Sequence, residues 1–198
     1  MTRPRLLTIL AALGGFVLQS GTATAGLLPT GWSVTPEAGN FRWAYAIVMP
    51  TDSQLKAGDY FTIYDFAGYV QDSSVTPSAD WSFSVQNVGP TPPLVLPTDD
   101  PNIPNLSWVY NGPTMNVGQV GLGNFMATSM YETAIESHFT ARTHRASDGK
   151  VDTNITTTEV PVPSDSGSNV PEPTTLVLAA LGLPLLGLAR LRRKGMVG

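Results

Sequence analysis

The sequence contains no cysteine, which excludes disulfide bonds, thiolate metal sites and a cysteine nucleophile. Charged residues make up only 13% of the 198 residues, and just two histidines are present, His138 and His144. Their separation of six residues corresponds to about 20 Å along a β-strand, so one metal ion cannot bind both. We therefore expect two surface histidines on one strand face, and we assign no metal site and no cofactor.

Motifs of common enzyme classes are also missing: there is no Gly-x-Ser-x-Gly, no P-loop and no dinucleotide-binding fingerprint. Glycoside hydrolysis needs two carboxyl groups at a defined separation, and acidic residues near expected strand ends offer weak candidates. These are Asp59, Asp65, Asp80, Glu132 and Glu136. A glycan hydrolase therefore ranks third among the functional hypotheses, and no residue is assigned a catalytic role.

Long hydrophobic runs occur only near the two ends of the sequence. Arg3 and Arg5 precede an apolar stretch at 6–18, and the small residues Ala23 and Ala25 flank Thr24. This order of features is typical of a secretory signal peptide. We expect signal peptidase to cut after Ala25, which makes residues 1–25 the signal peptide. An uncleaved N-terminal anchor is the alternative.

The second hydrophobic run covers 176–188 and is followed by a basic cluster, Arg190, Arg192, Arg193 and Lys194. A helix over 174–189 would be about 24 Å long, slightly short of a ~30 Å hydrocarbon core. Flanking Arg and Lys side chains can reach the interface, so such a helix can still cross the bilayer. The basic cluster predicts a cytoplasmic C-terminus. A buried core helix is the alternative.

A short motif, Val170-Pro171-Glu172-Pro173, stands directly before this hydrophobic run. Together, the motif, the apolar segment and the basic cluster resemble the PEP-CTERM sorting signal, which an exosortase reads in the membrane. The resemblance covers 170–194 and implies transient retention in the inner membrane, followed by an exosortase cut near 171–173. Family behaviour then implies transfer to the cell surface or release into exopolysaccharide. Residues 55–70 and 105–112 resemble uncharacterised ectodomains of PEP-CTERM proteins.

Between the two ends, residues 26–169 hold five Lys and Arg residues against 14 Asp and Glu residues, a difference of −9. Such a surface repels phosphates, which argues against nucleic-acid binding. We expect one domain at 26–160 and a stalk rich in Pro and Ser at 161–169. Asp99, Asp100, Asp148 and Asp152 are weak calcium candidates, and solvated turn acids are the preferred interpretation.

The pattern of the middle segment is β throughout. Trp81, Phe83 and Val85 alternate with polar residues, which is typical of a half-buried strand. The expected strands are 41–49, 60–66, 81–88, 106–110, 124–131, 137–145 and 151–158. A Pro-rich stretch at 89–104 is expected to be an extended surface connection. Short strands with Gly and Pro punctuation predict an all-β fold, a single antiparallel β-sandwich of jelly-roll or Ig-like type.

Four tryptophans are the last functional clue. Trp81 and Trp108 are expected in the core, whereas Trp32 is the most exposed and could contact a glycan. We predict an exported, non-enzymatic protein of the cell surface or of an exopolysaccharide-rich biofilm matrix. A polysaccharide-binding module is the second hypothesis.

Overall fold

The computed structural model describes residues 26–164 of the chain. Within this part there are nine strands and no helix, so no helix there is long and apolar enough to cross a membrane. The strands are β1 (Leu28–Glu37), β2 (Asn40–Met49), β3 (Ser53–Gln54), β4 (Tyr60–Ile63), β5 (Trp81–Gln86), β6 (Asn105–Tyr110), β7 (Val120–Ser129), β8 (Thr133–Arg145) and β9 (Val151–Val162).

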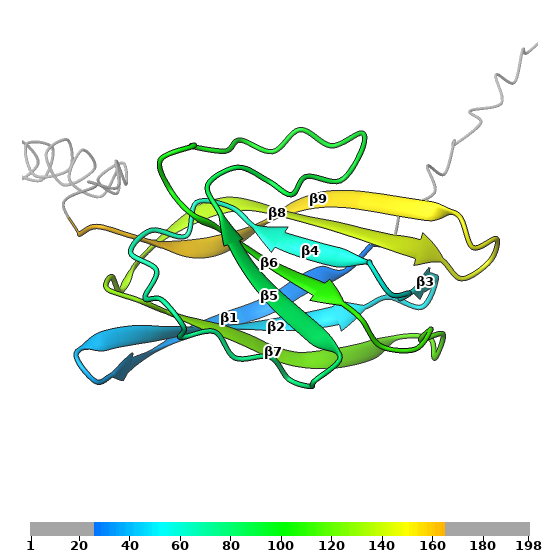
Figure 1. Ribbon diagram of the computed structural model, residues 1–198, viewed down its shortest axis with the longest axis horizontal. Coiled ribbons are helices and arrows are strands. Elements are labelled where there is room, and N and C mark those ends of the chain that lie inside the picture. The colour runs from blue at the N-terminus through cyan, green and yellow to red at the C-terminus, as the bar shows by residue number, and fades with distance from the viewer. Residues whose placement is uncertain (1–25, 165–198) are drawn as a thin grey trace, which may run out of the picture.

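The strands form two layers (Figure 1). One sheet has the order β1-β2-β7, and the other runs β9-β8-β4-β6-β5. The short β3 pairs with β8 just beyond the start of β4. Every pairing between these strands is antiparallel. The prediction of an all-β antiparallel sandwich is confirmed.

Aromatic side chains fill the space between the sheets. Phe61 of β4 is fully buried, and its ring packs against rings from both layers. Its neighbours, with centroid distances, are Phe125 at 4.9 Å, Trp108 at 5.1 Å, Phe139 at 5.3 Å and Trp81 at 5.8 Å. Aromatic pairs in these geometries contribute beyond their burial. The prediction that Trp81 and Trp108 belong to the core is confirmed, since they are 7% and 0% exposed.

Several strands differ from the sequence-based expectation, among them β1 and β4. β1 was not predicted, because Pro29, Gly31 and Pro36 interrupt its pattern, yet it pairs with β2 along its length, with a register shift between Pro29 and Gly31. β4 ends at Ile63 rather than at residue 66. The reason is Asp65, whose φ of 57° lies in the left-handed region and cannot continue a strand.

β9 also runs farther than expected, through Pro161 and Val162, the first residues of the expected stalk. Proline has no backbone N–H to donate, so it is tolerated on an edge strand. β9 is such a strand, since β8 is its partner in the sheet. The carbonyl of Pro161 accepts a hydrogen bond from the backbone N–H of Ala67 at 3.2 Å. The ordered domain therefore continues to Val162.

The Pro-rich connection lies over the outer face of the larger sheet, at the top of Figure 1. As predicted it contains no strand, but its N-terminal part is tied to the sheet. Tyr64 donates its hydroxyl to the Pro90 carbonyl at 3.1 Å, and Thr62 donates to the same carbonyl at 2.9 Å. The exposed part carries Leu94 and Leu96, which are 100% and 93% exposed.

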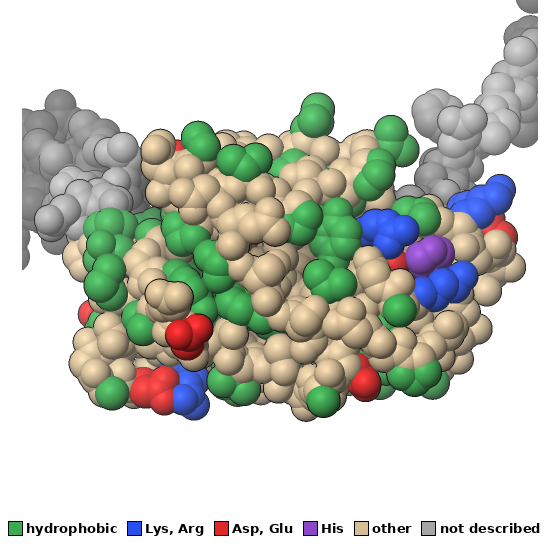
Figure 2. All heavy atoms as spheres, in the orientation of Figure 1, with side chains coloured by type: hydrophobic (Ala, Val, Ile, Leu, Met, Phe, Trp, Pro, Cys, Tyr) green, Lys and Arg blue, Asp and Glu red, His purple; other side chains and the backbone are tan. Residues whose placement is uncertain are grey.

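Charge is unevenly distributed over this fold. Figure 2 shows basic side chains and a histidine gathered at the right-hand end of the molecule, near β3 and the β8–β9 hairpin, while apolar side chains collect on the left-hand half of this face. Four of the five cationic residues between 26 and 164 lie at this basic end: Lys56, Arg142, Arg145 and Lys150. The fifth, Arg42, pairs with Glu37 across the β1–β2 hairpin.

Candidate functional site

Trp32 lies on β1 at the edge of the smaller sheet, where that sheet meets β9. It is 45% exposed, whereas Trp43 beneath it is fully buried. The two rings stack with centroids 5.6 Å apart and an interplanar angle of 19°. One face of Trp32 is thus fixed against the core while the side chain remains partly open to solvent. Trp32 is the most exposed of the four tryptophans, as predicted.

Beside Trp32 lies a hollow of about 320 Å³, which we call the Trp32 groove. β1 supplies one wall, and Glu136 of β8 and Glu159 of β9, which are register partners, supply the other. Thr157 donates its hydroxyl to Glu136 Oε2 at 3.2 Å. The residues that line the Trp32 groove are Pro29, Thr30, Gly31, Trp32, Glu136, Thr157, Thr158 and Glu159. None of them is cationic. An aromatic ring beside carboxylate and hydroxyl oxygens suits an uncharged ligand rich in hydroxyl groups.

Tyr45 supports the floor of this region from below. Its hydroxyl donates to the backbone carbonyl of Glu159 at 3.0 Å, which ties the smaller sheet to β9. Burial raises the pKa of Tyr45 well above its ordinary value, and the nearby Glu159 carboxylate adds to this effect. Tyr45 therefore stays neutral and keeps its proton for this bond.

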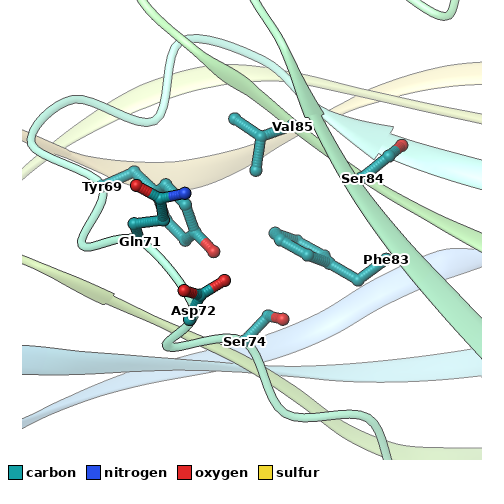
Figure 3. Close-up of a pocket in the computed structure, with 7 residues that line it drawn as sticks. All are labelled: Tyr69, Gln71, Asp72, Ser74, Phe83, Ser84 and Val85. Carbon is teal, nitrogen blue, oxygen red and sulfur yellow. The ribbon is translucent and has the colours of Figure 1, made fainter.

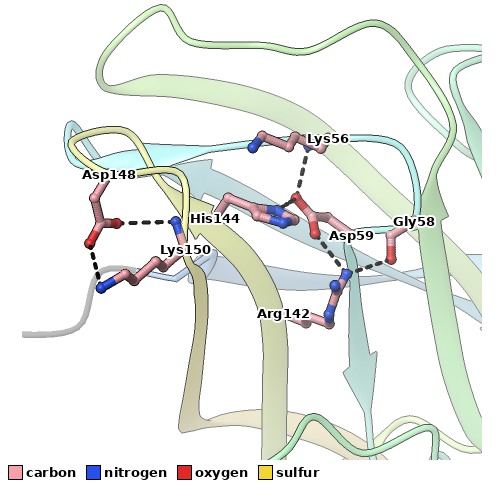
Figure 4. A network of polar contacts seen from close by, with 7 residues as sticks. All are labelled: Lys56, Gly58, Asp59, Arg142, His144, Asp148 and Lys150. Carbon is pink, nitrogen blue, oxygen red and sulfur yellow. Dashed lines mark hydrogen bonds and ion pairs between the residues drawn. The ribbon is translucent and has the colours of Figure 1, made fainter.

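A second group of polar residues surrounds Asp59, at the start of β4 (Figure 4). The Asp59 side chain is fully buried. One carboxylate oxygen accepts from Arg142 Nη1 at 3.0 Å, and the other lies 2.9 Å from His144 Nδ1 and accepts from the Lys56 backbone N–H at 2.8 Å. Arg142 also donates to the Gly58 carbonyl at 3.1 Å. These contacts fasten the 56–59 turn to β8.

The two histidines do share one face of β8, but the expectation that both are simple surface residues is wrong for His144. Its side chain is only 14% exposed, because it packs on Asp59. His138 meets a different loop, and its Nδ1 accepts from the Thr98 backbone N–H at 2.9 Å. Sequence spacing gave no sign of either partner, since Asp59 and Thr98 lie 85 and 40 residues away.

Aspartates considered for calcium instead hold loops together. Asp99 accepts from the Gly89 N–H and from Asn105 Nδ2, and Asp100 accepts from the Asn102 backbone and side chain. Within 26–164 no group of three or more His, Cys, Asp or Glu residues is arranged to hold a metal ion.

Asp148 at the β8–β9 hairpin accepts from the Lys150 N–H at 3.1 Å. That bond, with the charges of Arg145 and Lys150, lowers the pKa of Asp148. Asp152 lies in β9, where it is buried and accepts from the N–H of Thr153 at 3.1 Å. Both residues therefore have local partners in the hairpin and its following strand.

Three of the carboxylates considered for hydrolysis lie in different surroundings. Asp59 is bound by Arg142 and His144, and Glu136 belongs to the Trp32 groove. Asp65 lies beyond β4, where it accepts from the Asp100 N–H at 2.9 Å. Burial raises the pKa of Asp65, and the carboxylates of Asp99 and Asp100 raise it further, against the opposing effect of the Asp100 N–H.

Several predicted sites lie outside the described residues. They are the signal-cleavage residues Ala23 and Ala25, the sorting motif Val170, Pro171, Glu172 and Pro173, and the basic cluster Arg190, Arg192, Arg193 and Lys194.

Comparison with known proteins gives information on the C-terminal residues 169–194. No curated protein matches the chain. A family model described as the PEP-CTERM protein-sorting motif matches residues 169–194, which include the Pro171-Glu172-Pro173 sequence and end at Lys194. The match does not reach the β-sandwich. The chain thus carries a PEP-CTERM protein-sorting signal, which makes it an exported protein that is processed by an exosortase.

Proposed function

We infer that the protein is a non-enzymatic component of the cell surface or of the extracellular matrix, delivered there after exosortase processing. The observation that carries this inference is the sorting signal at 169–194, placed a few residues after a complete β-sandwich. Between the end of β9 at Val162 and the start of the matched motif lie only residues 163–168. Six residues can span at most about 20 Å, which is long enough to hold the expected cut site away from the folded domain.

The sequence of the motif fits a protease substrate. Pro171 and Pro173 fix their own φ angles and disfavour helix at the residues before them. The Pro171-Glu172-Pro173 sequence therefore has a low propensity for helix, and an extended backbone is what a protease binds. The reaction belongs to the exosortase, and this chain contributes the recognised segment.

The contacts of Asp59, the most buried of the candidate acids, support the non-enzymatic part of the proposal. Asp59 accepts hydrogen bonds from Arg142 and from a backbone N–H, and it contacts His144. Both carboxylate oxygens of Asp59 are therefore occupied by contacts to β8 and to the 56–59 turn. The Asp59–His144 pair is better explained as a fastening between a turn and a strand.

The test is to express Glu172→Ala in the native host and to measure where the protein resides. We expect an uncut precursor held in the membrane fraction, whereas the control Ser168→Ala, just outside the matched motif, should be processed normally. Mass spectrometry of the wild-type secreted protein should find no peptide beyond Leu176. Secreted wild-type protein with an intact tail would contradict the proposal.

A polysaccharide-binding role is the second candidate, and the Trp32 groove is the observation that favours it. The open Trp32 ring offers a flat apolar surface, and Glu136, Glu159 and Thr157 offer oxygen atoms beside it. A glycan array should show binding that Trp32→Ala abolishes. If the array is silent for the unsubstituted protein, this candidate fails while the processing result stands.

A further inference from the structure

A larger hollow lies at the opposite edge of the sandwich, between β5 and the segment 69–75 (Figure 3). β5 is the last strand of its sheet, and 69–75 borders β7 of the other sheet through bridges at Tyr69 and Val75. The cavity measures about 480 Å³. We call it the β5 pocket, and it is distinct from the Trp32 groove in both position and lining residues.

One wall of the β5 pocket is apolar. Phe83 and Val85 point from β5 into the space and face Tyr69 (Figure 3). The Tyr69 and Phe83 rings have centroids 5.8 Å apart and are tilted, and Phe83 also packs on the buried Trp108 at 5.0 Å. Phe83 and Val85 continue the core-facing side of β5, but Val85 remains 38% exposed. The sandwich core is therefore open to solvent at this edge.

The opposite rim is polar and held in place by β7. The N–H of Val70 donates to the Thr128 carbonyl at 2.9 Å, and the N–H of Thr128 donates to Ser73 Oγ at 2.9 Å. Val75 and Met126 exchange two backbone hydrogen bonds of 2.9 and 3.0 Å. A rim anchored on both sides loses little conformational entropy when a ligand binds.

Gln71 and Asp72 lie on this anchored rim. Asp72 has a φ of 58°, a left-handed conformation that is uncommon outside glycine. Among the described residues, neither side chain makes a hydrogen bond, and both border the pocket together with Ser74. The rim thus offers a free amide and a free carboxylate above an aromatic wall.

We propose that the β5 pocket binds a neutral saccharide unit of a glycan. The C–H face of a sugar ring is apolar and packs on Tyr69 and Phe83, while its hydroxyl groups donate to Asp72 and exchange hydrogen bonds with Gln71. Apolar walls with a few placed polar groups are typical of ligand sites. None of the lining residues is cationic, and the acidic excess of the domain repels anionic ligands. The sorting signal assigns no ligand, so this inference goes beyond the proposed function.

The test is a glycan array of neutral and uronate-containing oligosaccharides, probed with the full chain in mild detergent and followed by calorimetry on the strongest binder. We expect the strongest binder to be neutral. Gln71→Ala and Asp72→Asn each remove hydrogen-bonding capacity at the rim, and each should weaken binding about five- to tenfold. Gln86→Ala is the matched control, because Gln86 is an exposed residue of β5 outside the pocket, and it should leave affinity unchanged.

Other outcomes overturn the proposal. Silence of all neutral glycans, or a preference for uronates, would exclude a neutral saccharide. Binding that survives both rim substitutions but is lost in Trp32→Ala would assign the ligand to the Trp32 groove instead. Membrane retention of Glu172→Ala is measured separately, so failure of this pocket proposal leaves the processing result intact. Phe83→Ala is avoided because Phe83 also packs on Trp108 in the core.

Discussion

Two aspartates flank β4, and their surroundings are opposite. Asp59 precedes the strand, is fully buried, and meets Arg142 and His144. Asp65 follows the strand and meets Asp99 and Asp100, so its pKa is raised by burial and by these like charges. The comparison shows that the fully buried carboxylate has cationic or histidine partners, although the domain is acidic and has few cations. The partly exposed carboxylate of Asp65 has carboxylates as neighbours instead.

The largest expected loss in the free energy of unfolding is that of Asp59→Ala. The substitution leaves the Arg142 guanidinium and the His144 ring without their shared acceptor, and breaking one side of a buried pair costs about 3–5 kcal/mol. Arg142 is 27% exposed, which places the expected loss at the lower end of that range. Urea denaturation of the processed protein, followed by tryptophan fluorescence, measures it. Glu132→Ala, an exposed acid, is the control, and a similar small loss for both variants would refute the role given to Asp59.

The second largest loss of stability is expected for Tyr64→Phe, which tests the contact between the end of β4 and the Pro-rich connection. The Tyr64 hydroxyl contacts the Pro90 carbonyl, Thr91 Oγ1 and Thr140 Oγ1 at 3.1, 2.8 and 3.2 Å. Its removal should cost about 1–1.5 kcal/mol and loosen the Pro-rich connection locally.

Limited proteolysis separates the local effect of Tyr64→Phe from the global one. Thermolysin cuts before large apolar residues, so cleavage at the exposed Leu94 and Leu96 should accelerate several-fold. Tyr60→Phe is the matched control, because the Tyr60 hydroxyl makes no hydrogen bond within 26–164. Equal cleavage rates in both variants would show that Tyr64 does not tether the connection.

Asp65→Asn should stabilise the protein at neutral pH. Because the folded-state pKa of Asp65 is raised, ionisation of this group disfavours folding, and the penalty appears as pH rises through that pKa. Asparagine removes the charge, tolerates the positive φ, and still accepts from the Asp100 N–H. Since Asp65 is partly exposed, we expect a rise in Tm of only about 1–3 °C at pH 7. The gain should disappear below about pH 4, and a gain that persists there would contradict the electrostatic explanation.

Asp148→Asn is the smallest effect, because Asp148 is an exposed hairpin residue. Its pKa is lowered by the Lys150 N–H and by Arg145 and Lys150, so its stabilising contribution is present at neutral pH and is lost as pH falls through the lowered pKa. We expect a fall in Tm below about 1 °C at pH 7 that vanishes in high salt. A larger fall in Tm that persists in high salt would show that this hairpin contributes as much to stability as Asp59 does.

The sequence alone determined the class of fold, and it determined that the protein is exported and processed by an exosortase. Alternation in 81–86 and the Gly and Pro punctuation between strands are local signals. Strand geometry converts the first into structure, and glycine's tolerance of positive φ, as at Gly58 and Gly149, converts the second. The sorting signal is likewise a contiguous pattern that needs no fold to be read.

What only the tertiary structure decided depends on contacts between distant residues. β1 is a strand because β2 is beside it, although its own pattern is broken by proline and glycine. His144 is largely shielded from solvent because its side chain packs on Asp59, 85 residues away in the sequence. The β5 pocket exists because, within 26–164, β5 is the last strand of its sheet and the anchored 69–75 segment lies opposite it. Spacing along the chain cannot specify which surfaces meet, since that depends on how two sheets pack and where each one ends.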